Sequence, residues 1–214
     1  MYVPPHFAET DIPALHAAMR GSGLVTLVTM TEDGMIASHL PVMLSPDPAP
    51  YGTLIGHLAH ANPQTKGVLG DALVIFQGPE GYITPSYYAT KRENAKVVPT
   101  WNYTAIHAYG TLRFVHEPDR LLEIVTALTQ RHETPRAEPW AVTDAPADFV
   151  QGMLKGIVGL EVTITPLEGK RKMSQNRPAS DIEGVISGLR ADGRADLAEA
   201  VDQAALAAAP PRSA

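Results

Sequence analysis

The chain has 214 residues, which suits one domain or one domain with a small appendage, and its 44% hydrophobic and 19% charged shares are those of an ordinary globular protein. The absence of cysteine excludes disulfides, zinc–thiolate sites, iron–sulfur clusters and cysteine nucleophiles. The formal net charge of -6 argues against a chain that binds DNA unaided, because such proteins usually present a basic face.

The amino-terminal segment contains neither a basic region nor an apolar run, so it does not read as a signal peptide. No stretch of the chain reaches the ~18 consecutive apolar residues of a membrane span. We therefore expect a cytoplasmic protein without a membrane contact. The first predicted helix covers 10–20, where Thr10 or Asp11 is the N-cap, and Gly21 and Gly23 end it.

Strands dominate the middle of the sequence. We expect them at 24–30, 35–44, 53–59, 72–77, 82–84, 100–115 and 157–164, with turns at 31–34 and 78–81. Short helices are predicted just after Asn62, around 87–91, over 118–131 and over 149–154. Short strands joined by hairpin turns favour an antiparallel barrel or sandwich, and the absence of GxGxxG and GxxxxGK[ST] sets aside dinucleotide and P-loop folds.

The composition changes after Arg177, where Ala, Asp, Gly and Arg become dominant. Two amphipathic helices broken at Asp192-Gly193 are expected there, followed by a frayed Ala/Pro tail. The predicted organisation is a barrel domain over 1–177 and a helical appendage over 178–214. The fold class is α+β, mainly antiparallel β, with peripheral helices.

Three segments carry polar chemistry. The first, Gly56 to Gln64, crowds His57, His60 and Asn62 between a strand and a helix start, with Lys66 just beyond. Backbone N–H groups at a helix N-terminus attract anions, so a phosphate is the natural ligand. The alternative is that Asn62 is only a cap and the histidines lie on the surface. A metal site is the weaker interpretation, because histidines three apart on a strand point to opposite faces.

The second segment, Lys96 to Thr104, places an asparagine between two aromatic residues at a strand entry. Aromatic rings offer stacking surface and an amide can meet the polar edge of a heterocycle, although a Trp and Tyr in the core would explain the pattern equally. Alternation puts Trp101 and Tyr103 on one face of the strand and Asn102 on the other. We expect Asn102 to face the ligand and the aromatics to be buried in the core or in a dimer contact.

The third segment, Lys170 to Arg177, joins basic and amide side chains directly after the last predicted strand. A solvated charged loop is the usual explanation for such a run. The clustered amides Gln175 and Asn176 are less usual in a loop of that kind.

Together these segments resemble the PaiB-type FMN-binding negative transcriptional regulators. The resemblance rests on five blocks in register: Met1 to Phe7, Gly56 to Pro63, Tyr82 to Tyr88, Val98 to Tyr103 and Lys172 to Asn176. It implies an FMN-binding split β-barrel, related to pyridoxamine-phosphate oxidases, in which two subunits share two FMN molecules across their interface. The strands at Leu24–Met30 and Thr104–Val115 are candidates for the dimer contact.

The resemblance also assigns site residues; it implies no metal ligand and leaves the catalytic residues unidentified. His57 and the loop from His60 to Asn62 would meet the phosphate. Residues near the ring or ribityl chain would come from the strand after Pro99, and the block after Arg171 occupies the place where the oxidases carry arginines. The expected cofactor-binding residues are His57, His60, Ala61, Asn62, Lys66, Asn102, Tyr103, Thr104, Lys172, Ser174, Gln175 and Asn176.

Two departures from the family pattern matter. The position of His60 more often carries arginine, and an imidazole would make phosphate attraction weaker and pH-dependent. The last block lacks the fixed cations that an oxidase acting on a phosphorylated amine needs, which argues against that activity.

The resemblance leaves the function class open. The main hypothesis is a homodimeric FMN-binding protein linked to negative control of transcription, with direct DNA binding undecided. The alternative is a flavin-dependent oxidoreductase or flavin reductase, because flavin itself performs the redox chemistry. A haem-binding relative is a third hypothesis, for which no histidine is singled out.

Overall fold

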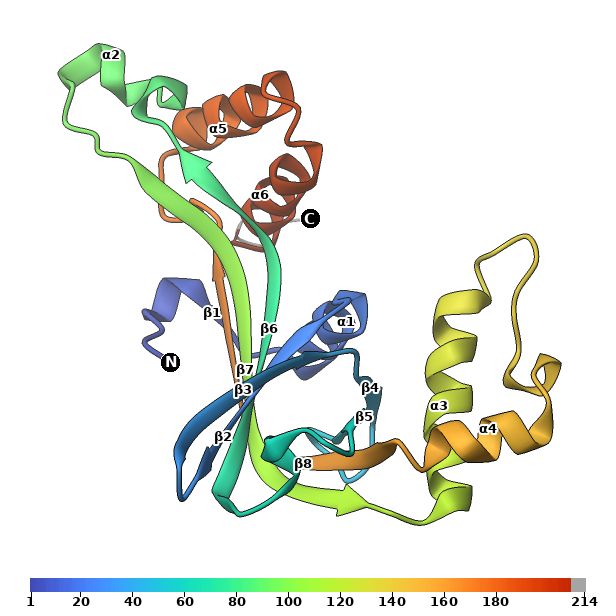
Figure 1. Cartoon of the computed structure of the whole chain (residues 1–214). Coiled ribbons are helices and arrows are strands. Elements are labelled where there is room, and N and C mark those ends of the chain that lie inside the picture. Colours follow the sequence, from blue (N-terminus) through green and yellow to red (C-terminus); the bar gives the residue numbers. More distant parts are fainter. Residues whose placement is uncertain (209–214) are drawn as a thin grey trace. The chain divides into compact units, whose positions relative to one another are not determined.

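The structure is a computed structural model that describes residues 1–208 (Figure 1). Its internal contacts divide the chain into two compact units. The first unit contains Met1–Thr10, Gln77–Ile106 and the described residues from Glu168 onward. The second unit contains Asp11–Phe76 and His107–Leu167. Each unit is described by itself below.

An antiparallel sheet supplies the framework of the chain. Its strands are β1 (Ala8–Glu9), β2 (Val25–Thr31), β3 (Gly34–Leu40), β4 (Met43–Ser45), β5 (Thr53–Ala59), β6 (Val68–Ile83), β7 (Thr100–Val115) and β8 (Ile157–Lys172). The order is β3-β2-β6-β7-β8-β5-β4, with β1 paired to β8. The strands β6, β7 and β8 are each 16 residues long, and each contributes residues to both units.

The second unit packs helices against its part of the sheet. These helices are α1 (Ile12–Gly21), α3 (Pro118–Glu133) and α4 (Ala147–Leu154), with the 3₁₀ turns η2 (Pro63–Thr65) and η4 (Val142–Asp144). Alternate residues of β2 are buried, as expected for a strand with one face on a core. Strands β7 and β8 come very close at Gly110, where a Cβ atom would stand 2.1 Å from the carbonyl oxygen of Thr163. Only glycine allows that approach.

The first unit packs its helices around a separate apolar cluster. These are α2 (Thr90–Asn94), α5 (Ala179–Ala191) and α6 (Ala195–Ala208), with the 3₁₀ turns η1 (Pro5–Phe7) and η3 (Pro85–Tyr87). The cluster consists of Ile83, Tyr88, Met173, Val185, Leu189, Leu197, Ala198, Val201 and Ala204. Tyr87 lies along α5, where a Cβ at Gly188 would meet its ring at 2.2 Å, and its hydroxyl bonds to Asp192.

The predicted fold class is confirmed: the chain is mainly antiparallel β with peripheral helices. The bounds predicted for β5 and β7 are those observed, and α5 and α6 are broken around Asp192-Gly193 as expected. The predicted tail after Ala208 lies outside the described residues. The predicted domain boundary between 177 and 178 stays an expectation. The two compact units are divided at other positions, and residues on both sides of that boundary lie in the first unit.

Three strand predictions were wrong. No turn interrupts β6 at 78–81, because its glycines serve close packing: a Cβ at Gly78 would meet Thr104 at 3.0 Å, and one at Gly81 would meet Leu197 at 2.6 Å. The predicted second strand is broken at Pro41, which separates β3 from β4. The last strand continues to Lys172, so the first basic residues of the third segment are part of β8 and not of a loop.

Candidate functional site

In the second unit, His57 is the predicted site residue whose surroundings call for a ligand. It lies on β5, opposite Gly159 of β8, and is partly buried. Its Nδ1 atom is buried without a hydrogen-bond partner. Burial lowers the pKa of His57, so the ring is a neutral donor or acceptor more readily than a cation. An unsatisfied buried nitrogen costs about 1–3 kcal/mol, which a ligand group bonded to it would recover.

Asn62 is occupied within the chain. Its Nδ2 donates to Ser38 Oγ at 2.9 Å, and its Oδ1 accepts from the backbone N–H of Gln64 at 2.9 Å. The helix that it caps is the single 3₁₀ turn η2 and not an extended helix with a dipole. The alternative interpretation of Asn62 as a cap therefore describes its contacts, and η2 is too short to add the dipole of a helix.

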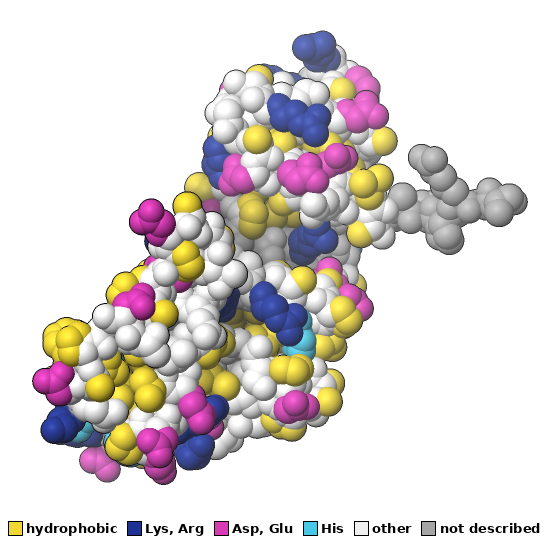
Figure 2. All heavy atoms as spheres, turned by 90° about the vertical axis from the view of Figure 1, so that its right-hand side faces the viewer, with side chains coloured by type: hydrophobic (Ala, Val, Ile, Leu, Met, Phe, Trp, Pro, Cys, Tyr) yellow, Lys and Arg dark blue, Asp and Glu magenta, His cyan; other side chains and the backbone are white. Residues whose placement is uncertain are grey.

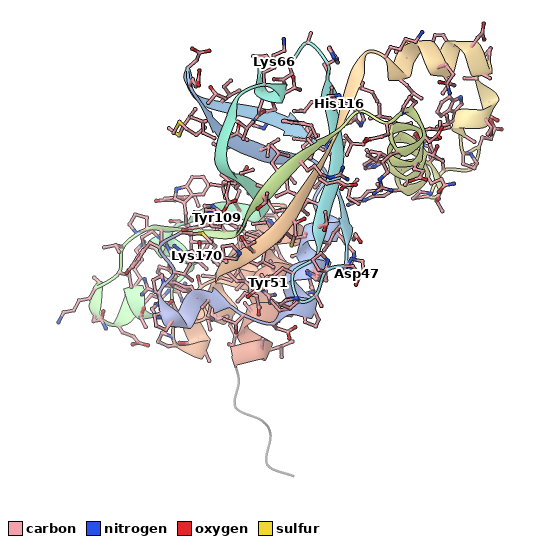
Figure 3. All side chains as sticks on the ribbon, turned by 90° about the horizontal axis from the view of Figure 1, so that it is seen from below. Asp47, Tyr51, Lys66, Tyr109, His116 and Lys170 are labelled. Atoms are coloured by element: carbon pink, nitrogen blue, oxygen red, sulfur yellow. The ribbon has the colours of Figure 1, made fainter. Side chains whose placement is uncertain are left out.

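His60, which follows β5, is exposed. Its backbone N–H donates to Gly156 O at 2.8 Å, and it lines a cavity of about 300 Å³ together with His116 and Lys155. Ala61 and Lys66 are also exposed, but neither lines this cavity. Figure 3 shows Lys66 on the loop after η2 and His116 between β7 and α3.

In the first unit, Asn102 faces inward and is completely buried. Its Nδ2 donates to Ser174 Oγ at 2.9 Å, and that hydroxyl donates back to Asn102 Oδ1 at 3.2 Å. Ser174 has a φ of 63°, a left-handed conformation that is uncommon outside glycine. The structure thus joins two predicted site residues, Asn102 and Ser174, to each other.

Trp101 and Asn102 take opposite faces of β7, as alternation predicts, but their burial reverses the expectation. Trp101 is 51% exposed and meets the equally exposed Tyr82 edge to face, with ring centroids 6.4 Å apart. The prediction that Trp101 is buried in the chain's own core is therefore wrong. The physical reason is that Ser174 offers the amide of Asn102 a buried partner, which turns the other face of the strand outward.

Two lysines on one face of β8 contact residues at the start of β7. The buried Lys170 donates to Tyr2 O at 3.1 Å, and its Nζ lies 5.1 Å from the centroid of the Tyr103 ring. Lys172 donates to Thr100 Oγ1 at 2.5 Å, and burial lowers the pKa of Lys172. Lys170 was not predicted as a site residue. Its spacing from Lys172, which is that of two residues on one strand face, was the available signal.

The other predicted residues of the first unit have local roles or face solvent. Gln175 accepts from Met173 N at 2.7 Å and donates to the carbonyl of Arg171, which closes the loop after β8. Thr104 packs on Gly78, and Asn176 is exposed. The predicted residues thus form one group in the second unit, 57–66, and another in the first, 102–104 with 172–176.

Comparison with known proteins decides the family. A family model described as "Putative FMN-binding domain" matches residues 1–166. The "Protease synthase and sporulation protein PAI 2" of Bacillus subtilis is 35% identical over 192 residues, which cover 89% of each chain. The chain belongs to the PaiB-type FMN-binding family. This confirms the resemblance drawn from the five sequence blocks, and it makes FMN the cofactor of the domain.

Solved structures are similar to the chain in fold alone. A conserved hypothetical protein, Rv2991 from Mycobacterium tuberculosis, aligns with a TM-score of 0.57 at 12% identity and covers 83% of this chain and 94% of that one. The flavocytochrome Anf3 from Azotobacter vinelandii aligns with a TM-score of 0.56 at 12% identity, over 79% and 72% of the two chains. These alignments agree with the predicted split-barrel class.

The described residues, Met1 to Ala208, contain no cluster of three or more His, Asp or Glu side chains arranged to hold a metal ion. None of their helices is both long and apolar enough to cross a membrane.

Proposed function

We propose that this chain is a homodimeric FMN-binding protein linked to negative control of transcription, the role that the resemblance to PaiB-type regulators implies. The observation that carries the FMN part is the family match over residues 1–166, and the unsatisfied Nδ1 of His57 fits a site that a ligand completes. The cytoplasm is the proposed location.

We place the phosphate of FMN near His57 and His60, with Ala61 and Lys66 on the same loop. The ring and ribityl chain belong near Tyr103 and Thr104, with the 172–176 block beside them. Lys170 then positions Tyr103 through its contact with that ring, and Lys172 holds Thr100 at the start of β7. Bound FMN supplies redox chemistry, whereas the chain binds and orients it. Because Asn102 is engaged by Ser174, its role is to hold that loop against β7.

Flavin affinities test the phosphate placement. FMN should bind more tightly than riboflavin from about pH 6 to 8, because only FMN carries the phosphate that the residues near His57 and His60 would bind. Equal affinities for the two flavins across that range would show that the phosphate does not contribute. Equilibrium dialysis with each flavin at both pH values provides the comparison.

The dimer is supported by exposed apolar side chains on strands near the sheet edge. Met30 of β2 is opposite Met35 of β3 and Leu69 of β6, and all three are at least 45% exposed. A cluster of that kind on a sheet face is typical of a contact surface. Sedimentation velocity at micromolar concentration should show a dimer, and a stable monomer would reject it.

α6 lacks the basic residues that direct contact with DNA usually requires. The helices α5 and α6 are joined by the short turn around Gly193, as in helix-turn-helix proteins. However, α6 carries Asp196, Glu199 and Asp202 and neither Lys nor Arg. Figure 2 shows Lys and Arg scattered among Asp and Glu on the face it views. A gel-shift assay on the promoter next to the gene decides whether the chain binds DNA alone.

A flavin-dependent oxidoreductase is the second candidate function. The observation that favours it is Lys172, whose lowered pKa and contact with Thr100 are typical of a site more than of a solvated surface. Oxidation of reduced nicotinamide by the FMN-loaded chain, lost in Lys172→Met, would support this candidate. Absence of any turnover would leave regulation as the function.

A further inference from the structure

A basic cavity in the second unit has no assigned ligand. It has a volume of about 300 Å³. It is lined by His60, His116, Pro118, Leu121, Gln151, Leu154, Lys155 and Ile157. None of these residues is acidic.

The three basic residues are brought together by the ends of three different elements. His60 follows β5, His116 follows β7, and Lys155 follows α4. The pairing of β5 with β8 ends at Ala59 and Ile157, and the bond from His60 N to Gly156 O extends it to the residue beside Lys155. The sheet therefore fixes the backbone that carries two of the three side chains.

No hydrogen bond or ion pair occupies the side chains of His60, His116 or Lys155 within residues 1–208. Two carboxylates close in sequence to the cavity residues already accept hydrogen bonds. Glu117 accepts from the backbone N–H of His116 at 3.1 Å, and bonds from the backbone lower the pKa of that carboxyl. Glu161 of β8 is paired with Arg113 and Arg120. The cavity thus presents nitrogen donors without a counter-charge among its lining residues.

We propose that this cavity binds a phosphate group. Three separate nitrogen-bearing side chains can donate to the several oxygens of a phosphate, and such charge-assisted bonds are the strong ones. The cavity adjoins Pro118, in the first turn of the 16-residue α3, where the helix dipole adds attraction for an anion. A metal ion is disfavoured, because Lys155 is a cation and only two histidines are available.

The phosphate has two chemical sources, FMN and free phosphate. The first source rests on the proposed function and would make this cavity the phosphate end of the flavin site, reached by His60 with His116 and Lys155. The second source is independent of it. The buried side chains Leu121 and Leu154 on the cavity wall are compatible with both.

Phosphate titrations of the flavin-free full chain test the proposal at constant ionic strength, with ³¹P NMR as the readout. His116→Gln and Lys155→Gln should each weaken binding at least about fivefold, because each removes a charge-assisted contact. The matched controls are His132→Gln, at the opposite end of α3, and Lys96→Gln on an exposed loop. Both controls should bind within about twofold of the natural chain, since they change the same charges away from the cavity.

Titrations of the same variants with FMN and riboflavin identify the source. Weaker binding of FMN but not of riboflavin places the flavin phosphate in the cavity. Weaker binding of inorganic phosphate alone indicates a separate anion site, and it would support the proposal even if the chain bound no flavin. Unchanged affinities for both phosphate and FMN in His116→Gln and Lys155→Gln, or equal losses in the controls, would overturn the proposal.

Discussion

The Asn102–Ser174 pair and the cavity around His116 use polar side chains in opposite ways. Asn102 and Ser174 lie in the first unit, are buried, and exchange two hydrogen bonds. His116 and Lys155, in the second unit, are exposed at a cavity and have no side-chain partner among the described residues.

This difference distinguishes side chains that stabilise the fold from side chains whose donors are available to a ligand. A buried polar group needs a hydrogen-bond partner in the folded chain, so a pair that satisfies each other indicates a structural role. Exposed basic groups that converge without a counter-charge contribute little to folding and keep their donors for an anion. Residue type alone does not distinguish the two, because an asparagine in an aromatic block resembles a ligand contact in sequence.

The largest expected effect is on the satisfied pair. Asn102→Ala leaves Ser174 Oγ without its buried partner and should lower the free energy of unfolding by about 1–3 kcal/mol. Denaturant unfolding monitored by circular dichroism measures the loss. Trp101→Ala is the matched control on the other face of β7, and it should cost less because half of that ring is already exposed. A larger loss from Trp101→Ala than from Asn102→Ala would show that the exposed ring stabilises the first unit more than the buried Asn102–Ser174 pair does.

A smaller effect is expected from the hydrogen bond of Tyr87 within the first unit. Its bond to the Asp192 carboxylate raises the pKa of Tyr87 to about 12, from an ordinary value near 10. A folded pKa above the unfolded one gives stability that is complete below about pH 10 and is lost as the pH rises toward 12. Tyr87→Phe should therefore lose less stability than the natural chain between pH 10 and 12. Equal losses in thermal unfolding across that window would contradict the assigned bond.

The smallest effect is expected at the cavity. His116→Gln and Lys155→Gln should each change the free energy of unfolding by less than about 0.5 kcal/mol, as is usual for surface positions without partners. Denaturant unfolding monitored by circular dichroism provides these free energies as well. A loss above about 1 kcal/mol in either variant would mean that the side chain stabilises the fold and is not reserved for an anion.

The sequence predicted the features that depend on local patterns. The alternation of β5 and β7 gave their bounds, the composition change gave α5 and α6, and the motif blocks gave the family. The turn predicted at 78–81 was wrong because a glycine needed for close packing cannot be told in sequence from a glycine needed for a turn.

Local sequence patterns could not predict contacts between residues that are far apart in the chain. Asn102 and Ser174 are 72 positions apart, and only the sheet brings them together. His116 and Lys155 were missed for the same reason, since each is a single basic residue after an element end. A charged residue at such an end was the one signal that the sequence offered.

The most direct test of FMN binding is the visible absorbance of the full chain after it is mixed with FMN and desalted. The family assignment predicts that a flavin spectrum stays with the protein and that acid-released cofactor is FMN. Colourless protein after desalting, or a Soret band of bound haem in place of the flavin spectrum, would contradict it.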